Sequence, residues 1–221
     1  MDSPLAISNL CNLFLSLTIT SAYHLNQLLE GGRKLESLRL ELFSNGSVIS
    51  RAFRPHSGPG SFPVLREFTF VFLGVENDDD DNNDGGREDE DLDLFPAVVE
   101  VVRGHPILEA LCLSYRQPEG SRQNLKAFGY SAAIWGVLPS LVRLRTLSMD
   151  VPKDLSSALG GWLIPRTVVA LDLRVPEDAS WKLDCAVSMF SISMTSRLMI
   201  QLSSLCGSSN CGRVYRLGSG F

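Results

Sequence analysis

One spacing pattern constrains this 221-residue chain more than any other feature: an apolar residue followed at the third and fifth positions by two more. It occurs six times, as Leu10-Leu13-Leu15, Leu35-Leu38-Leu40, Leu65-Phe68-Phe70, Leu108-Leu111-Leu113, Leu144-Leu147-Met149 and Val168-Leu171-Leu173. Successive occurrences begin 25, 30, 43, 36 and 24 residues apart. Alternating apolar positions indicate a strand with one buried face. One such segment carries little weight, whereas six at these intervals predict a repeated strand.

A second regularity precedes four of these strands. Helix-like segments end at Leu29, Val102, Leu138 and Trp162, each six residues before the first apolar residue of the strand. The five residues between are turn formers in each case: EGGRK, RGHPI, PSLVR and LIPRT. Neither the strand edge nor the helix stripe can be buried within one unit, so the units are expected to stack. The predicted fold is α/β: a right-handed, irregular leucine-rich-repeat solenoid with parallel strands on its concave side and helices and loops on its convex side.

Local signals predict where the helices begin and end. Four residues are suited to the beginnings: Ser21, Pro96, Ser131 and Asp154. Gly31 and Gly104 stand where a left-handed residue commonly ends a helix. The unit over residues 50–70 has Gly and Pro in place of a helix, so a loop is predicted on its convex side.

The charge distribution predicts the domain organisation. Residues 76–93 hold eleven acidic side chains and one arginine, and they fall in the longest interval between strands. We therefore expect a leucine-rich-repeat domain over residues 1–176, with 76–93 as an acidic disordered insertion. Residues 177–221 lack the repeat and are expected to form a C-terminal cap or a poorly ordered tail. The rest of the chain is mildly basic, so the net charge of −5 says little about a partner.

The acidic insertion partly matches the calcium-loop template. Residues 80–85 and Asp91 supply acceptors at the first, third, fifth and twelfth places, with glycine at the sixth. Arg87 stands where the template has an apolar residue, and the preceding FTFVFLGV is typical of a strand, not of a helix. A run this rich in Asp and Asn matches by chance. A solvated loop is expected, and no metal site or cofactor is predicted.

Sequence motifs of catalysis are missing from the chain. It holds no GxSxG, Walker loop, HExxH or GxGxxG, and its three histidines lie far apart, with His105 in a turn. The five cysteines are scattered without a CxxC pair, which favours reduced thiols in a cytoplasmic or nuclear protein. There is no dense basic run for nucleic acid, and the apolar stretch 185–206 is too rich in serine to span a membrane. The chain is predicted not to be an enzyme, and a hydrolase with dispersed catalytic residues is the remaining enzymatic alternative.

The N-terminal segment is also compatible with secretion, a second possible location of the protein. Residues 10–22 are apolar enough for a signal-peptide core, and Thr20-Ser21-Ala22 is compatible with cleavage, but no positive charge precedes them. Asn45-Gly46-Ser47 is a glycosylation sequon. The alternative is therefore a secreted leucine-rich-repeat binding protein.

Three segments, HLNQLLEGGRKLESLRL, LFPAVVEVVRGHPILEALCLSY and LPSLVRLRTLSM, resemble the leucine-rich region of fungal F-box-like proteins, and the likeness spans about residues 9–176. The resemblance implies that the repeats select a target while a separate F-box recruits a ubiquitin-ligase core. No segment before the first repeat matches an F-box, so the chain would be the target-recognition part, or a fragment of a longer protein. It also departs from the usual Asn or Cys three residues after each motif, which predicts irregular units. Those places hold Thr18, Phe43, Leu73, Arg116, Pro152 and Pro176.

The expected function is protein binding on the concave sheet. Residues between the apolar positions of a strand, and the residue after the last of them, point away from the core. They form a mixed-charge surface suited to a protein partner. The predicted partner-binding residues are Arg39, Glu41, Glu67, Asp150, Asp172 and Arg174.

Overall fold

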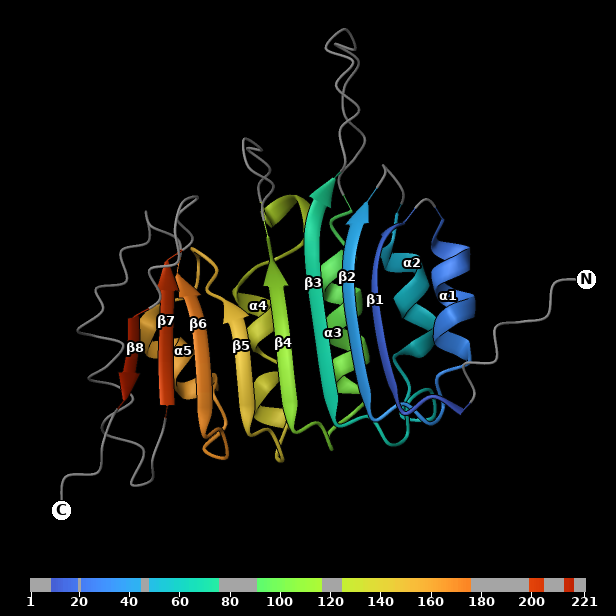
Figure 1. Ribbon diagram of the computed structural model, residues 1–221. Helices are drawn as coiled ribbons and strands as arrows, with labels where there is room; N and C mark the ends of the chain where they lie inside the picture. Colours follow the sequence, from blue (N-terminus) through green and yellow to red (C-terminus); the bar gives the residue numbers. More distant parts are fainter. Residues whose placement is uncertain are drawn as a thin grey trace, which may run out of the picture.

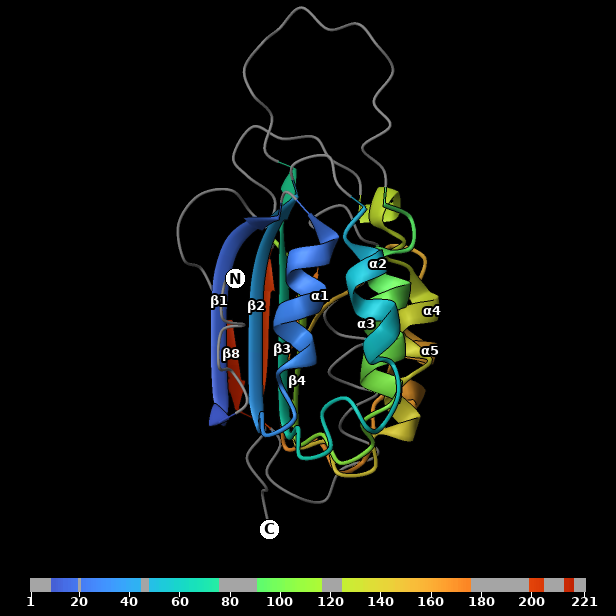
Figure 2. The same ribbon diagram turned by 90° about the vertical axis from the view of Figure 1, so that its right-hand side faces the viewer.

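The computed structural model describes residues 9–19, 21–44, 48–75, 91–116, 125–175, 199–204 and 213–216. These residues form an α/β structure with one eight-stranded sheet in the order β1 to β8. The first seven strands are parallel, and β8 is antiparallel to β7. The helices cover one face of the sheet (Figure 1, Figure 2). No described helix lies on the opposite face, which corresponds to the side predicted to be concave and is called the outer face below.

Strands and helices alternate from β1 to β6. The strands are β1 (Asn12–Ile19), β2 (Ser37–Ser44), β3 (Glu67–Val75), β4 (Ala110–Tyr115), β5 (Thr146–Asp150), β6 (Ala170–Val175), β7 (Met199–Ser204) and β8 (Arg213–Arg216). The α-helices are α1 (Ala22–Glu30), α2 (Ser50–Phe53), α3 (Leu94–Arg103), α4 (Ala132–Trp135) and α5 (Ser157–Leu163). The described 3-10 helices between the strands are η2 (Arg54–His56), η3 (Leu125–Phe128) and η4 (Leu138–Ser140). None of the described helices is long and apolar enough to cross a membrane.

The six motifs lie side by side in register, as predicted. Their second apolar residues form one row across the sheet, and their third apolar residues form another. The rows are Leu13, Leu38, Phe68, Leu111, Leu147 and Leu171, and then Leu15, Leu40, Phe70, Leu113, Met149 and Leu173. From β2 to β6 these side chains are at most 2% exposed, and they form the core between sheet and helices. Burying one such side chain is worth about 1.5–3 kcal/mol relative to leaving it exposed.

The backbone repeats as well. At the start of five successive strands, the amides of two consecutive residues donate to one carbonyl of the preceding unit. The accepting carbonyls belong to Cys11, Glu36, Arg66, Glu109 and Arg145. Just before each of these strands, the amide of the first apolar motif residue donates to the carbonyl three residues earlier, over 3.0–3.2 Å. Each unit therefore enters the sheet through the same turn.

The glycines at the helix ends depart from the prediction. Gly31 and Gly104 have φ of −73° and −67°, so neither is left-handed. Gly104 is required for a different reason: a Cβ there would lie 2.2 Å from the carbonyl oxygen of Ser57. The glycine lets two neighbouring units approach closely.

The predicted helix starts are met in part. Ser21 directly precedes α1 but makes no side-chain cap bond, and Pro96 lies in the first turn of α3, which begins at Leu94. Asp154 does not open α5, because Ser156 accepts the capping bond from the amide of Leu159 at 3.3 Å.

The prediction of a loop on the convex side of residues 50–70 is wrong in part, because α2 and η2 form there. Phe53 of α2 is buried and packs edge-to-face on Phe70 of β3, with ring centroids 5.5 Å apart. Trp162, expected to end a buried helical stripe, is instead 86% exposed, and Leu163 packs against the core in α5.

Most of the predicted acidic insertion lies outside the described residues, including residues 80–85 of the calcium-loop template. Its last residues belong to the folded part. Asp91 is buried and accepts a hydrogen bond of 2.8 Å from the amide of Ser50, and Asp93 pairs with Arg54 at 2.5 Å. Of residues 177–221, the structure describes β7 and β8, which extend the sheet.

Candidate functional site

The six predicted partner-binding residues occupy outer-face positions of the sheet. Side chains alternate along a strand, and the two apolar rows point to the helices, so the residues between them point outward. The register places Arg39 beside Phe14 and Thr69, and Asp172 beside Ser148. The candidate site is this face, and its described side chains fall into two groups.

The first group is a polar cluster on β4, β5 and β6, made by Ser114, Ser148, Asp150, Asp172 and Arg174 and called the Arg174 cluster here. Arg174 reaches from β6 across β5: its Nη1 donates to Ser114 Oγ on β4, and its Nη2 lies 3.5 Å from Ser148 Oγ. Its Nε is 3.8 Å from Asp150 Oδ1. The arginine side chain is only 18% exposed, so it lies along the sheet and covers what is beneath it.

Asp150 is the residue that departs most from expectation. It lies at an outer-face position but is fully buried, and its Oδ2 accepts a hydrogen bond of 2.5 Å from the backbone amide of Tyr115. The paired register of β4 and β5 ends at Leu113 and Met149, so the carboxylate satisfies an amide just beyond it. Burial raises the pKa of Asp150 to about 6, although the guanidinium of Arg174 acts in the opposite direction. Asp150 therefore joins β5 to β4, and its side chain is not accessible to a partner in this structure.

The cluster is rich in hydrogen-bond acceptors. Ser148 Oγ donates to Asp172 Oδ2 at 3.0 Å, which leaves Asp172 Oδ1 buried without a donor among the described residues. The Oδ1 of Asp150 likewise has no hydrogen-bond donor there. A buried acceptor without a donor destabilises the folded chain. The guanidinium of the arginine that extends across β5 therefore offsets only part of the desolvation cost of the two carboxylates.

The second group lies on β1, β2 and β3 and is more accessible. Arg39 pairs with Glu41 at 2.5 Å, and its guanidinium lies 5.0 Å from the ring centroid of Phe14. The Arg39 side chain is 50% exposed and Phe14 is 59% exposed, while Glu67 is exposed at the start of β3. This part of the face presents a cation beside an aromatic ring, with the carboxylate of Glu41 paired to Arg39 and that of Glu67 on the neighbouring strand.

The outer-face residues that sequence reasoning missed include Phe14, Cys112, Ser114 and Ser148. The alternation rule that selected Arg39 and Asp172 could have found them, because they occupy equivalent positions in neighbouring strands. These four residues are uncharged, whereas all six predicted partner-binding residues are charged.

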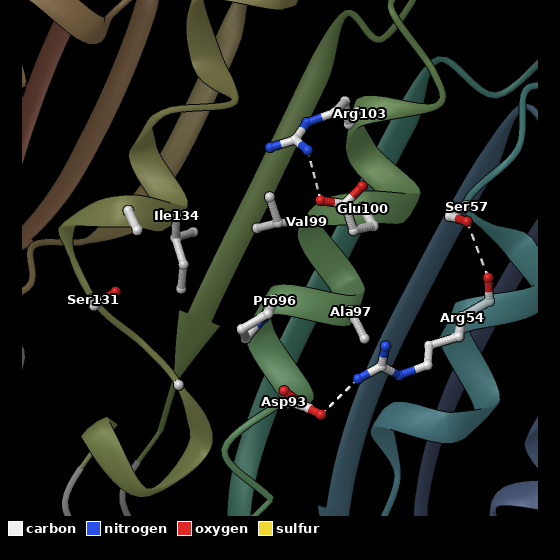
Figure 3. Close-up of a pocket in the computed structure, with 12 residues that line it drawn as sticks. Arg54, Ser57, Asp93, Pro96, Ala97, Val99, Glu100, Arg103, Ser131 and Ile134 are labelled. Carbon is white, nitrogen blue, oxygen red and sulfur yellow. Dashed lines mark hydrogen bonds and ion pairs between the residues drawn. The ribbon is translucent and has the colours of Figure 1, made fainter.

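A groove of about 450 Å³ lies on the helix layer, between η2, α3 and α4 (Figure 3). Two ion pairs line it: Arg54 with Asp93 at 2.5 Å, and Arg103 with Glu100 at 2.7 Å. Each guanidinium is neutralised by a carboxylate of its own unit or the next one. The lining includes neither histidine nor cysteine.

Two buried histidines pack near one phenylalanine. The rings of His56 and His105 have their centroids 5.6 and 5.7 Å from that of Phe62. Burial lowers the pKa of both histidines. Over the described ranges, no group of three or more His, Cys, Asp and Glu side chains could hold a metal ion.

Comparisons with protein-family models, curated proteins and solved structures give no significant match for this chain.

Proposed function

We propose that the chain is an irregular leucine-rich-repeat solenoid that binds a protein partner on its outer face, without catalysis. The repeated entry into the sheet supports the solenoid. The same two-amide bond to one carbonyl, preceded by the same turn, occurs at five strands, at intervals of 30, 43, 36 and 24 residues. A unit that repeats its backbone bonds as well as its apolar residues is what stacking of equivalent modules requires.

Binding through the outer face is supported by the group around Arg39. Arginine and aromatic side chains are enriched in protein interfaces, and Arg39 and Phe14 are both accessible there. The Arg174 cluster holds polar side chains of three adjacent strands in fixed positions, which would reduce the ordering cost of binding. This exposed cation–aromatic pair on an outer face without a described helix is the observation that carries the proposal.

The proposal extends to the target-recognition part of an F-box type of ubiquitin ligase, on the resemblance of the repeats. A cytoplasmic or nuclear location follows from that role. It is favoured over the secreted alternative because residues 12–19 of the apolar N-terminal segment form β1, with all eight residues in register with β2. A signal-peptide core would be removed from the mature chain.

The test is quantitative affinity capture with two charge-reversed baits. The outer-face bait carries Arg39→Glu and Glu67→Lys, which change accessible residues and leave the buried Arg174 cluster intact. The matched control carries Glu100→Lys and Arg103→Glu on α3, where both side chains are at least 50% exposed. Each pair preserves net charge.

We expect partners captured by the unaltered chain to be lost tenfold or more with the outer-face bait and retained with the α3 bait. Recovery of ubiquitin-ligase subunits with the unaltered chain would support the adaptor role. Equal retention by both baits would reject the outer face as the binding surface.

A further inference from the structure

The two turns that lead into β5 and β6, at the lower end of the sheet in Figure 1, carry arginines and no carboxylate. Arg143 and Arg145 lie in the first turn, and Arg166 lies in the second. All three side chains are exposed, and none of them forms an ion pair or a hydrogen bond with a described residue. The arginines that do form ion pairs in the described part of the chain are Arg39, Arg54, Arg66, Arg103 and Arg174.

The chain around these two turns is basic. Residues 125–149 and 155–171 together hold four basic side chains and no aspartate or glutamate. The turn before them supplies Glu109, whose backbone carbonyl accepts the amide of Arg145, but its carboxylate pairs with Arg66 at 3.0 Å. The positive charge of the two turns is therefore not neutralised by a carboxylate of the same turns or of the turn before.

Exposed valines accompany the arginines. The amide of Val169, which is 51% exposed, donates to the carbonyl of Arg145 at 2.8 Å, so these two residues are neighbours in adjacent units. Val142, which is 65% exposed, and Arg166 hold equivalent places, each as the second residue of a turn closed by a backbone bond of 3.1 Å. Adjacent strands lie about 4.8 Å apart, so each pair presents an arginine next to a valine. The Arg145 surface is defined here as Val142, Arg143, Arg145, Arg166 and Val169.

We propose that the Arg145 surface binds an acidic segment of a protein partner, in which carboxylates alternate with apolar side chains. Guanidinium groups bind carboxylates through two parallel hydrogen bonds, and the three arginines have no competing carboxylate in their own turns. The two valines supply apolar area that a partner can remove from water. These residues precede the strands, so this contact is separate from the one proposed for the outer face.

The composition of the Arg145 surface favours a peptide over nucleic acid. Proteins that bind duplex DNA commonly neutralise about 6–10 phosphates, and those that bind single strands stack bases on aromatic rings. The surface offers three guanidiniums and no aromatic ring among its five residues. Exposed valines contribute to neither mode, whereas apolar side chains form the desolvated centre of protein interfaces.

Fluorescence anisotropy with a labelled acidic peptide, DELDELD, tests the proposal on the full chain. Saturable binding is expected, and it should weaken as the salt concentration rises from about 50 mM to about 500 mM, because exposed charges are screened. The amide peptide NQLNQLN keeps the shape but not the charge, and it is expected not to bind.

Charge reversal identifies the surface. Arg145→Glu with Arg166→Glu is expected to weaken peptide binding about tenfold or more, because attraction becomes repulsion at both positions. The matched control is Arg33→Glu with Arg51→Glu, which changes the net charge equally at two exposed arginines that also have no partner among the described residues. That control should bind as the unaltered chain does, and equal weakening in both variants would overturn the assignment.

A change without charge tests the apolar part. Val142→Ser with Val169→Ser is expected to weaken binding about threefold or more, and unchanged affinity would overturn the proposed role of the valines. Because all the substituted residues are exposed, each variant is expected to remain folded, which thermal unfolding verifies. The variant with Arg39→Glu and Glu67→Lys should bind the peptide normally, so this test is independent of the outer face.

Three other results would overturn the proposal. The first is no saturable binding at about 1 mM peptide. The second is tighter binding of a single-stranded heptathymidylate than of the peptide, which would assign the surface to nucleic acid. The third is an average mass above 24.3 kDa in sedimentation equilibrium that returns to this value in Arg145→Glu with Arg166→Glu, which would make a second copy the occupant.

Discussion

The carboxylate of Asp154 accepts hydrogen bonds of 3.1 and 3.2 Å from the backbone amide of Ala132, the first residue of α4, 22 positions earlier in the chain. Asp91 stands in the same relation to Ser50, the first residue of α2, across 41 positions. In both cases a unit supplies the side chain that satisfies a helix start in the unit before it. These two bonds tie neighbouring units together on the helix side, as the backbone bonds do in the sheet.

Asp91→Ala is expected to lower the free energy of unfolding by about 1–2 kcal/mol, because it removes the cap of α2 and leaves a buried amide without an acceptor. Urea denaturation monitored by circular dichroism measures the loss. Asp93→Ala is the matched control: its ion pair with Arg54 is about 60% exposed on each side and should contribute less than about 1 kcal/mol. Equal losses in the two variants would show that the Asp91 bond is not a tie between units.

Local sequence could predict the strands, because each apolar pattern both defines a strand and repeats. It could not predict the partner of Asp154, because a cap contributed from the next unit depends on how units stack. Ser131 and Asp154 looked alike as local helix openers, yet Asp154 acts on the helix that Ser131 precedes. Likewise, the acidic composition around Asp91 predicted a solvated segment, although Asp91 itself is buried.

The alternation of side chains along each strand predicted the candidate site in part. Alternation placed Asp150 on the correct face of the sheet but said nothing of its exposure. Its burial depends on Arg174 extending from the next strand to Ser114 two strands away, which is a choice of side-chain conformation. Trp162 shows the reverse case, since its spacing indicated a core position and the short α5 leaves it exposed.

The pKa of Asp150 predicts a loss of stability with rising pH. It is raised in the folded chain from 3.8 to about 6, so folding favours the protonated acid. Its stabilising contribution is full below pH 4 and disappears as the pH rises through 6. The total is on the order of 3 kcal/mol, from the shift at 1.36 kcal/mol per unit.

Asp150→Asn provides the comparison, because its amide oxygen can still accept from Tyr115 and it does not ionise. The difference in unfolding free energy between Asp150→Asn and the unaltered chain should grow in favour of the variant between pH 4 and 7. Urea titrations across that range measure it. Parallel curves would contradict a raised pKa at this position.

His105 predicts the opposite pH dependence. Burial lowers its pKa below 6.5, so the folded chain favours the neutral ring, and stability is lost as the pH falls below 6.5. Leu141 occupies the equivalent turn position of the next unit, which makes His105→Leu a substitution already accommodated by this backbone. The variant loses the bond of 2.6 Å to the Val101 carbonyl but also removes a buried Nε2 without a partner among the described residues. It should match the unaltered chain within about 1 kcal/mol at pH 7.5 and exceed it at pH 5. Equal acid sensitivity in thermal unfolding of the two proteins would refute this role.

The contact between Gly104 and Ser57 predicts a steric limit on the spacing of units. A Cβ at Gly104 would lie 2.2 Å from the Ser57 carbonyl oxygen, and neither backbone can move without shifting a whole unit. Gly104→Ala is therefore expected to destabilise the chain by about 1–3 kcal/mol, the usual cost of overpacking, even though its φ of −67° suits alanine. Gly60→Ala is the control, since no described heavy atom lies within 4 Å of a Cβ there. That variant should be neutral or slightly more stable, because alanine restricts the unfolded chain. If both variants unfold at the same urea concentration, the close approach of the two units does not limit the residue at position 104.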